Sequence, residues 1–221
     1  FDPLEAAKDP AQSIGLAGAD DIASIHRREN ETVVYLVEND QHQLQTLILP
    51  VRGYGLWSTL HGFIALKADL NTVVGLGFYQ HAETAGLGGE VDNPRWRALW
   101  PGKQVFADDG RPDIQIIKGS VDPSNPKAAH QVDGLAGASL TSKGVANLLK
   151  FWLGPQGFGP FIAHLKDGSV KVAGTAHPAG TPATARVTAE RAATPAGRHD
   201  GSTSSGVALP HDLIATAEGG R

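Results

Sequence analysis

Three hydroxyl side chains, Ser139, Thr141 and Ser142, stand in a glycine-rich stretch that reads DGLAGASLTSKGVANLLKFWLG from Asp133 to Gly154. The residues after them have helical periodicity, so the hydroxyls fall at the amino end of a helix. A helix N-terminus presents unpaired N–H groups and a partial positive charge, which together bind phosphate. Glycines just upstream let the backbone approach a ligand closely. The stretch is therefore a candidate phosphate site.

The same hydroxyls have a structural explanation, in which Thr141 or Ser142 caps the helix and the glycines form a turn. On this stretch alone the structural explanation is favoured, because helix caps are common. A nucleophile elbow does not fit, since Thr141 stands where Gly-x-Ser-x-Gly needs its second glycine. The sequence has neither a Walker-type Gly-Lys-Ser nor a strand followed by Gly-x-Gly-x-x-Gly. A direct NADH site is therefore not expected.

The composition excludes several kinds of chemistry. The chain of 221 residues has no cysteine, which excludes disulfides, zinc–thiolate sites, iron–sulfur ligation and thiol catalysis. Its 9 histidines show no metal-ligand spacing, and no acid, base and nucleophile form a recognisable triad. A net charge of -4 gives no field that would attract nucleic acid. We therefore expect no metal, no catalytic residue and no nucleic-acid partner.

The chain divides into three parts by composition. Residues 1–31 are mixed and polar, and residues 32–171 contain every aromatic residue except Phe1. Residues 172–221 are rich in Ala, Gly, Thr, Pro and Ser. The last part cannot bury enough apolar surface to offset the entropy of ordering, so we expect a disordered tail that is dispensable for folding. Residues 32–171 are expected to form the single folded domain.

Strand signals dominate the first half of this domain. Thr32–Glu38 and Leu44–Val51 are rich in β-branched and apolar residues, and the turn NDQHQ between them predicts a hairpin. The runs GFIALKA and TVVGLGFYQHAE repeat the pattern and are joined by DLN. Asp113–Gly119 alternates as a half-buried strand.

Two helices are expected. Asn93–Gly102 has a capping asparagine, a proline in its first turn and a glycine at its end. In the hydroxyl-rich stretch, one apolar face is formed by Val145, Leu148, Leu149 and Trp152. A Gly-Pro pair then ends that helix. Strands with helices at their edges predict an α+β fold, with a mixed, largely antiparallel twisted sheet and flanking helices.

A second cluster of interest is the glycine-rich loop AETAGLGGE, residues 82–90, after a predicted strand. Taken alone, it is a loop whose glycines form turns. Trp57, in GYGLWS, lies between glycines and polar residues, which favours the edge of a pocket over the core. Trp96, Trp100 and Trp152 lie on apolar helical faces and are expected in the core.

The stretch DGLAGASLTSKGVANLLKFWLG closely resembles the flavinylation segment of the NqrC family, the C subunits of the sodium-translocating NADH:quinone oxidoreductase. The resemblance continues, in the same order, over VVYLV, ILPVRGYGLWS, ETAGLGGEVDNPRWRALWPGK, IKG and GFGPFIAHLKDG. It covers about residues 28–168, and so most of the expected domain. The G subunit of the Rnf complex shares the flavin-attachment pattern and is a related alternative.

In that family, FMN is attached through its phosphate to a threonine. A flavin transferase reads the pattern Asp, two residues, Ser or Thr, Gly, Ala and Thr. Carried onto this chain, Asp133 is the acid of the pattern, and Gly137 and Ala138 match it. Ser139 takes the acceptor position, while Ala136 stands where a hydroxyl is usual. The resemblance therefore implies covalent FMN on Ser139, with the transferase recognising Asp133, Gly137 and Ala138.

The resemblance also implies which residues contact the cofactor. Thr84 and Leu87 look like residues that contact the isoalloxazine ring, with the glycines beside them letting the ring come close. The full implied set, besides Ser139, is Trp57, Thr84, Leu87, Gly88, Gly89, Leu140, Thr141 and Ser142.

The function implied is electron transfer by covalent FMN, in a bacterial inner-membrane complex that oxidises NADH, reduces quinone and pumps sodium. The chain would relay electrons between the other redox subunits and would have no active site of its own. The family's N-terminal membrane helix, missing from this chain, would hold the domain on the periplasmic side. Two alternatives stay open: a scaffold domain that is never flavinylated, favoured by Ala136 and Ser139, and an Rnf-type G subunit.

Overall fold

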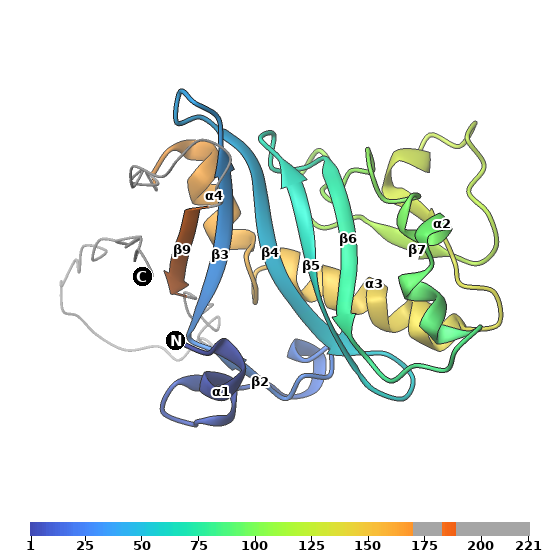
Figure 1. The fold of residues 1–221 in the computed structure, drawn as a ribbon, viewed down its shortest axis with the longest axis horizontal. Helices are drawn as coiled ribbons and strands as arrows, with labels where there is room; N and C mark the ends of the chain where they lie inside the picture. Colours follow the sequence, from blue (N-terminus) through green and yellow to red (C-terminus); the bar gives the residue numbers. More distant parts are fainter. Residues whose placement is uncertain (170–182, 189–221) are drawn as a thin grey trace, which may run out of the picture.

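A five-stranded antiparallel sheet is the centre of the fold (Figure 1). The structure, a computed structural model, describes residues 1–169 and 183–188. The strand order is β6-β5-β4-β3-β9. The strands are β3 (Glu31–Glu38), β4 (Leu44–Tyr54), β5 (Thr59–Lys67), β6 (Val73–Gln80) and β9 (Ala183–Thr188). The expected α+β class with a largely antiparallel sheet is confirmed.

β3 and β4 form the hairpin that the sequence predicts. Tyr35 pairs with Ile48, and the Asn39 N–H closes the turn by donating to the Gln43 carbonyl at 3.0 Å. Alternate residues of both strands are buried, as the period of two requires. β4 then pairs with β5 up to its last residue. The loop between them, which carries Trp57, therefore lies at one end of the sheet.

A long helix, α3 (Ser139–Leu153), runs across one face of the sheet, behind the strands in Figure 1, and α4 (Gly159–Asp167) follows it. The apolar face expected of α3 is buried in full: Val145, Leu148, Leu149 and Trp152. Trp96 and Trp100, also expected in the core, are buried. Gly154 ends α3, as its place before a proline predicts. The strands and α3 share one hydrophobic core.

The helices differ from expectation in two places. The prediction of a helix over Asn93–Gly102 is wrong in length, because α2 spans only Pro94–Arg97. The N–H groups of Leu99 and Trp100 donate three residues back rather than four, so the helix gives way to tight turns. α4 was not among the expected helices, since its 9 residues give only a short periodic signal.

Residues 1–31, set apart from the domain by composition, pack onto it. They contain α1 (Pro3–Lys8), β1 (Ser13–Gly15), the 3-10 helix η1 (Gly18–Asp20) and β2 (Arg27–Glu29). Arg52 of β4 reaches this layer and forms a buried ion pair with Glu29, at 2.6 Å. Its guanidinium also donates to the Arg27 carbonyl, at 3.1 Å. The change of composition at residue 32 therefore does not mark the edge of the folded unit.

A smaller sheet positions the glycine-rich stretch before α3. β7 (Gln115–Ile117) lies within the strand predicted at Asp113–Gly119 and pairs in parallel with β8 (Gln131–Asp133). Two further 3-10 helices are η2 (Gly88–Asp92), after β6, and η3 (Ala128–His130), before β8. Because β8 leads directly into the loop before α3, the small sheet fixes where that loop begins.

The segment 172–221 was expected to be a disordered tail. Within it, the backbone of β9 pairs with β3 from Glu31 to Leu36, so residues 183–188 are a strand. The rest of the expected tail lies outside the described residues. Composition did not predict the strand, because its pairing depends on the edge that β3 offers.

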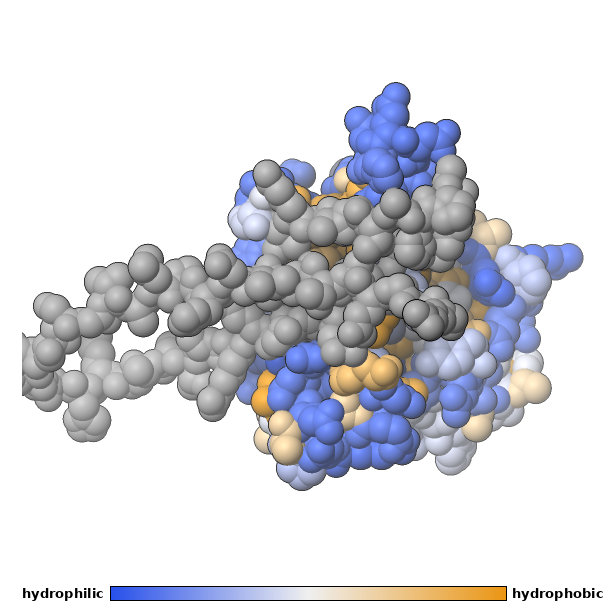
Figure 2. Space-filling model, turned by 60° about the vertical axis from the view of Figure 1, so that its left-hand side comes forward, coloured by the Kyte–Doolittle hydropathy of each residue, from blue (hydrophilic) through white to orange (hydrophobic). Residues whose placement is uncertain are grey.

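The coloured part of the surface that is visible in Figure 2 is mainly hydrophilic, with smaller hydrophobic patches between. In residues 1–169 and 183–188, no helix has the length and hydropathy of a membrane span. Some large apolar side chains are nevertheless exposed, among them Trp57, Leu87 and Leu140. All three belong to the site implied by the sequence.

Candidate cofactor site

The helix α3 begins at Ser139 without a side-chain cap. Its N-cap residue is Ala138, and the loop before it turns through Gly137 at a φ of 71°. The expected structural role of Thr141 or Ser142 as the N-cap is wrong, because the helix starts before them. No side chain therefore caps the first N–H groups of α3. Ser139 is exposed beside them.

Thr141 and Ser142 point into the protein and hold the site together. Thr141 is fully buried, and its hydroxyl donates to Glu83 Oε2 at 2.7 Å. The Ser142 hydroxyl accepts from the Leu135 N–H at 3.0 Å, which fixes the loop before the helix. Ser139 is therefore the exposed hydroxyl among the three candidates and the one that an attaching enzyme could reach, while Ser142 lines the adjoining groove with little exposed surface.

The Glu83 carboxylate joins three segments of the site. Besides the Thr141 hydroxyl, its donors are the backbone N–H groups of Leu56, Trp57 and Ser58, at 3.2, 2.9 and 3.0 Å. Burial alone would raise the pKa of Glu83, but the bonds from Thr141 and these N–H groups outweigh burial and lower the pKa. An ionised Glu83 therefore ties the β4–β5 loop to the first turn of α3.

The loop after β6 packs closely against the start of α3. Gly88 lies so near Thr141 that an added Cβ would be 2.5 Å from the threonine hydroxyl oxygen. The Leu87 side chain lies against Gly137, where an added Cβ would be 2.9 Å from Leu87 Cδ2. The structure thus brings the two glycine-rich clusters of the sequence into contact.

Large apolar side chains near the start of α3 face solvent. Trp57 is 65% exposed, Leu140 58% and Leu87 44%. Thr84 is exposed as well, and its carbonyl accepts from the Gly89 N–H at 2.9 Å, which closes the loop. Grouped apolar exposure of this kind marks a surface that a ligand or partner covers. Trp57 is therefore on the surface rather than in the core.

A groove of about 760 Å³ lies beside Ser139, between α3 and β7. Three lysines line it: Lys118, Lys143 and Lys150. Lys143 is one helical turn after Ser139 and so lies on the same side of α3. Ammonium groups and the N–H groups at a helix N-terminus both stabilise a phosphate. The surroundings of Ser139 therefore favour an anionic group.

Asp133, the acid of the attachment pattern, lines the same groove and is fixed at the end of β8. Its Oδ1 accepts from the Val121 N–H at 2.8 Å, and its carbonyl accepts from the Trp96 indole at 2.9 Å. Glu83 and the three lysines were not among the sequence candidates. A single carboxylate in a loop and scattered lysines give no distinctive signal, because only the fold gathers them around Ser139.

Comparison with known proteins points to the same region. Residues 55–154 match the family model described as an FMN-binding domain. The chain is 69% identical over 168 residues to the C subunit of the Na(+)-translocating NADH-quinone reductase of Pseudomonas aeruginosa, covering 76% of this chain and 64% of that protein. It is 48% identical over 171 residues to the C subunit of the same enzyme from Yersinia pestis, covering 77% and 63%. The chain thus spans slightly less than two thirds of the length of these curated relatives.

The fold also has a counterpart among solved structures. The crystal structure of Shewanella oneidensis NqrC matches with a TM-score of 0.70 and 38% sequence identity, over 76% of this chain and 75% of that chain. The matched FMN-binding region, residues 55–154, runs from the β4–β5 loop to the end of α3. It therefore contains both glycine-rich clusters.

Proposed function

Because the chain belongs to the NqrC family, the C subunits of the Na(+)-translocating NADH-quinone reductase, we propose that it is the electron-transfer flavoprotein subunit of such a complex. Ser139 holds FMN through a phosphoester, and the domain relays electrons between other redox subunits. One observation carries the proposal: Ser139 is the accessible hydroxyl at the uncapped end of α3, in the acceptor position of the flavinylation pattern.

The residues of the site fit FMN at its phosphate end. The first N–H groups of α3 have no side-chain cap, so they can donate to phosphate oxygens. Lys143 and Lys118 line the groove beside Ser139 and can balance the phosphate charge. Gly137 turns the chain at a positive φ and adds no side chain there.

The site also fits the ring end. Leu87 and Trp57 expose apolar surface that an isoalloxazine ring would cover, and Thr84 can donate a hydrogen bond from the same loop. Gly88 brings the backbone of this loop close to α3, and Gly89 packs against the backbone of Thr84 in the same loop, both without adding side chains. Glu83 holds the loop and the helix at a fixed spacing. Ring and phosphate would therefore be held by different, rigidly connected segments.

FMN, when bound, supplies one-electron transfer. The residues of the chain orient it and exclude water from part of its surface, and neither task needs an acid, base or nucleophile. We propose that this chain has no NADH-binding site of its own. Its proposed partners are a flavin transferase during maturation and the other subunits of an NADH-oxidising, quinone-reducing, sodium-pumping complex. In this proposal the domain stands on the periplasmic side of a bacterial inner membrane.

The test is expression of the chain with and without a flavin transferase, followed by measurement of the intact mass. We expect a gain of FMN less one water only when the transferase is present. Ser139→Ala should abolish both the gain and the flavin fluorescence on a denaturing gel, and Ser139→Thr should keep both. Ser120→Ala, which removes another exposed serine of the same groove, should be modified like the wild type.

The alternative function is a scaffold domain that is never flavinylated, and the departures at Ala136 and Ser139 from the pattern favour it. It predicts that the wild-type chain stays unmodified with the transferase while Ser139→Thr becomes yellow. The Rnf-type G subunit would leave the cofactor chemistry unchanged. Identity of 69% to a C subunit of the quinone reductase favours the NqrC family over it.

A further inference from the structure

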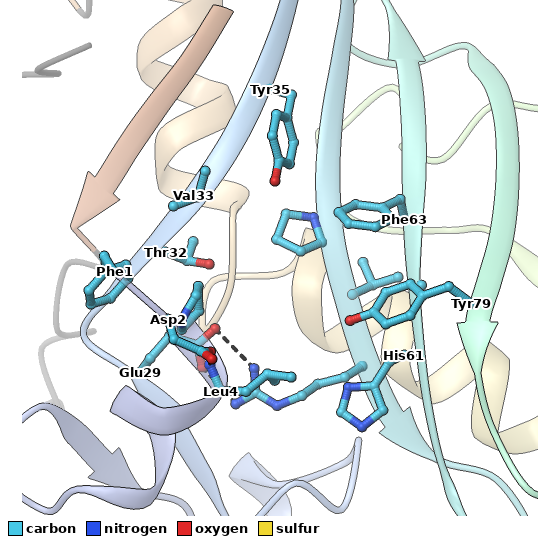
Figure 3. Close-up of a pocket in the computed structure, with 15 residues that line it drawn as sticks. Phe1, Asp2, Leu4, Glu29, Thr32, Val33, Tyr35, His61, Phe63 and Tyr79 are labelled. Atoms are coloured by element: carbon cyan, nitrogen blue, oxygen red, sulfur yellow. Dashed lines mark hydrogen bonds and ion pairs between the residues drawn. The ribbon is translucent and has the colours of Figure 1, made fainter. Parts of the chain in front are cut away.

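A second cavity opens on the face of the sheet opposite α3, where β3 and β4 separate (Figure 3). The last residue pair of their ladder in this direction is Tyr35 with Ile48. Continuing the register would bring Val33 opposite Pro50, which has no N–H to donate. The strands therefore diverge beyond this pair and leave a cavity of about 240 Å³.

A buried hydroxyl in the wall of this cavity lacks a partner. Thr32 is 6% exposed, and its hydroxyl makes no hydrogen bond within the described part of the chain. In Figure 3 its oxygen points toward the space between β3 and β4. Buried hydroxyls in proteins are nearly always paired, and leaving one unpaired is destabilising. A ligand with an oxygen at this position would satisfy it.

Aromatic rings form the opposite wall. Phe63 and Tyr79 lie 5.5 Å apart between ring centroids, and Tyr35 meets Phe63 edge-on at 6.0 Å. Tyr79 is 60% exposed, and Figure 3 shows its hydroxyl directed across the cavity toward β3. Rings in this arrangement offer a face or an edge to a further flat ring. The wall therefore favours an aromatic ligand.

The two charges at the base of the cavity are paired within the protein. Arg52 and Glu29, at its base, form the buried ion pair at 2.6 Å. Burial and the Arg52 guanidinium lower the pKa of His61, so its imidazole is neutral at pH 7. The Asp2 carboxylate, in the same lining, accepts from the Leu4 N–H at 2.8 Å, and its charge opposes an anionic ligand. A charged ligand would lose hydration in a site where Arg52 and Glu29 already satisfy each other, so an uncharged ligand is favoured.

We propose that this cavity binds a small, uncharged aromatic molecule that carries one hydroxyl or carbonyl oxygen, of the phenol class. Its ring packs against Phe63 and Tyr79, and its oxygen pairs with the Thr32 hydroxyl. The cavity lies on the other face of the sheet from α3, so the proposal goes beyond the flavin function and does not depend on it.

The probe is 4-ethylphenol, titrated into the 15N-labelled full chain made without a flavin transferase. We expect saturable shifts of the backbone amide signals of Thr32, Tyr35 and Phe63, with a Kd on the order of 1 mM, as a fragment of this size allows. Tyramine and 4-hydroxyphenylacetate carry a charge, and 4-ethylcyclohexanol lacks the aromatic ring. Each should bind at least about fivefold more weakly. Equal binding of all four compounds would overturn the proposal.

Substitutions of Thr32 separate the hydroxyl from the shape of the cavity. Thr32→Val should raise the Kd about three- to tenfold, the factor for one net hydrogen bond, while Thr32→Ser should stay within about twofold. Without ligand, Thr32→Val should not lower the midpoint of unfolding, because it removes an unpaired buried hydroxyl. Thr46→Val, a matched change on β4 outside the cavity, should bind 4-ethylphenol as the wild type does.

Ser139→Ala should bind 4-ethylphenol like the wild type, so that failure of the flavin proposal and failure of this one can be told apart. The proposal is wrong if 4-ethylphenol shifts no amide signals around the cavity. It is also wrong if Thr32→Val, folded as judged by its spectrum, binds the compound with unchanged affinity.

Discussion

Glu83 and Thr141, 58 positions apart in the chain, are joined by a hydrogen bond of 2.7 Å that the Thr141 hydroxyl donates to the carboxylate. The same carboxylate accepts from the Trp57 N–H at 2.9 Å. One buried side chain therefore sets the spacing of the β4–β5 loop, the loop after β6 and the first turn of α3. The position of Ser139, in that same turn, depends on this bond.

Replacing Glu83 by glutamine should destabilise the fold. The amide keeps the shape of the carboxylate but has one acceptor oxygen and no charge. If that oxygen stays on the Trp57 and Ser58 N–H groups, an NH₂ group takes the place of the oxygen that accepts from the Thr141 hydroxyl. We expect Glu83→Gln to lower the free energy of unfolding at pH 7 by about 1–3 kcal/mol, measured by chemical denaturation. Flavin attachment to Ser139 should slow as well, because the first turn of α3 loses its anchor.

The effect of Glu83→Gln should depend on pH. The pKa of Glu83 is lowered in the folded state from its ordinary value of 4.5. Stabilisation by the ionised carboxylate is therefore complete above about pH 4.5 and is lost as the pH falls through the folded-state pKa. The difference in free energy between wild type and variant should shrink over that acid window. Glu5→Gln, at an exposed position, is the control, and an equal effect of both variants would contradict the assigned role.

Gly88→Ala should disturb the contact between the two glycine-rich clusters. An added Cβ would lie 2.5 Å from the Thr141 hydroxyl oxygen and 2.7 Å from Glu83 Oε2, so the loop and the helix must move apart. We expect a loss of about 1–3 kcal/mol in the free energy of unfolding. Gly75→Ala is the control, because nothing lies within 4 Å of a Cβ there. If both variants unfold at the same denaturant concentration, the close contact is not important.

Leu87→Ala tests whether the loop after β6 holds the flavin ring. Leu87 is 44% exposed, so its truncation should cost less than about 1 kcal/mol of folding free energy and leave attachment to Ser139 intact. The ring should be held less tightly, so flavin fluorescence should rise and the midpoint potential should shift. Ile22→Ala, at a side chain 40% exposed, should change neither. If the flavin fluorescence and the midpoint potential of Leu87→Ala equal those of the wild type, this loop does not hold the flavin ring.

Local sequence patterns predicted the elements of the fold better than their ends. The β3–β4 hairpin and the buried face of α3 follow from periods of 2 and 3.6, which each segment carries within itself. The start of α3 was missed, because Thr141 and Ser142 looked like caps. Their hydroxyls instead bond to Glu83 and Leu135, partners that local sequence does not reveal.

The candidate site was predictable only in part, for the same reason. The family pattern singled out Ser139 and the loop around Leu87, and the structure brings these segments into contact. Glu83 lies within the quoted loop but was not singled out, since its role depends on N–H donors from a different hairpin. The divergence of β3 and β4 is a further case. Pro50 lies within the strand predicted at Leu44–Val51, but its missing N–H matters only once the register is known.

Composition and structure make opposite predictions for the segment after Lys171. Composition alone predicts that its removal leaves stability unchanged. In the structure, however, β9 pairs with β3 along Glu31–Leu36, whereas β4 pairs with β3 only from Tyr35 onward. Without β9, the first half of β3 would therefore have no strand partner in the main sheet.

Truncation after Lys171 should accordingly lower the free energy of unfolding by about 1–3 kcal/mol, as several ladder hydrogen bonds are lost. Backbone amides of Glu31–Leu36 should also exchange with solvent faster, as measured by hydrogen exchange. Ala185→Pro should reproduce part of both effects in the full chain, because Ala185 pairs with Val34 and proline removes its N–H. Ala185→Val keeps the N–H and is the matched control. If truncation and Ala185→Pro leave both measurements at wild-type values, β9 contributes nothing to the sheet and the composition-based expectation holds.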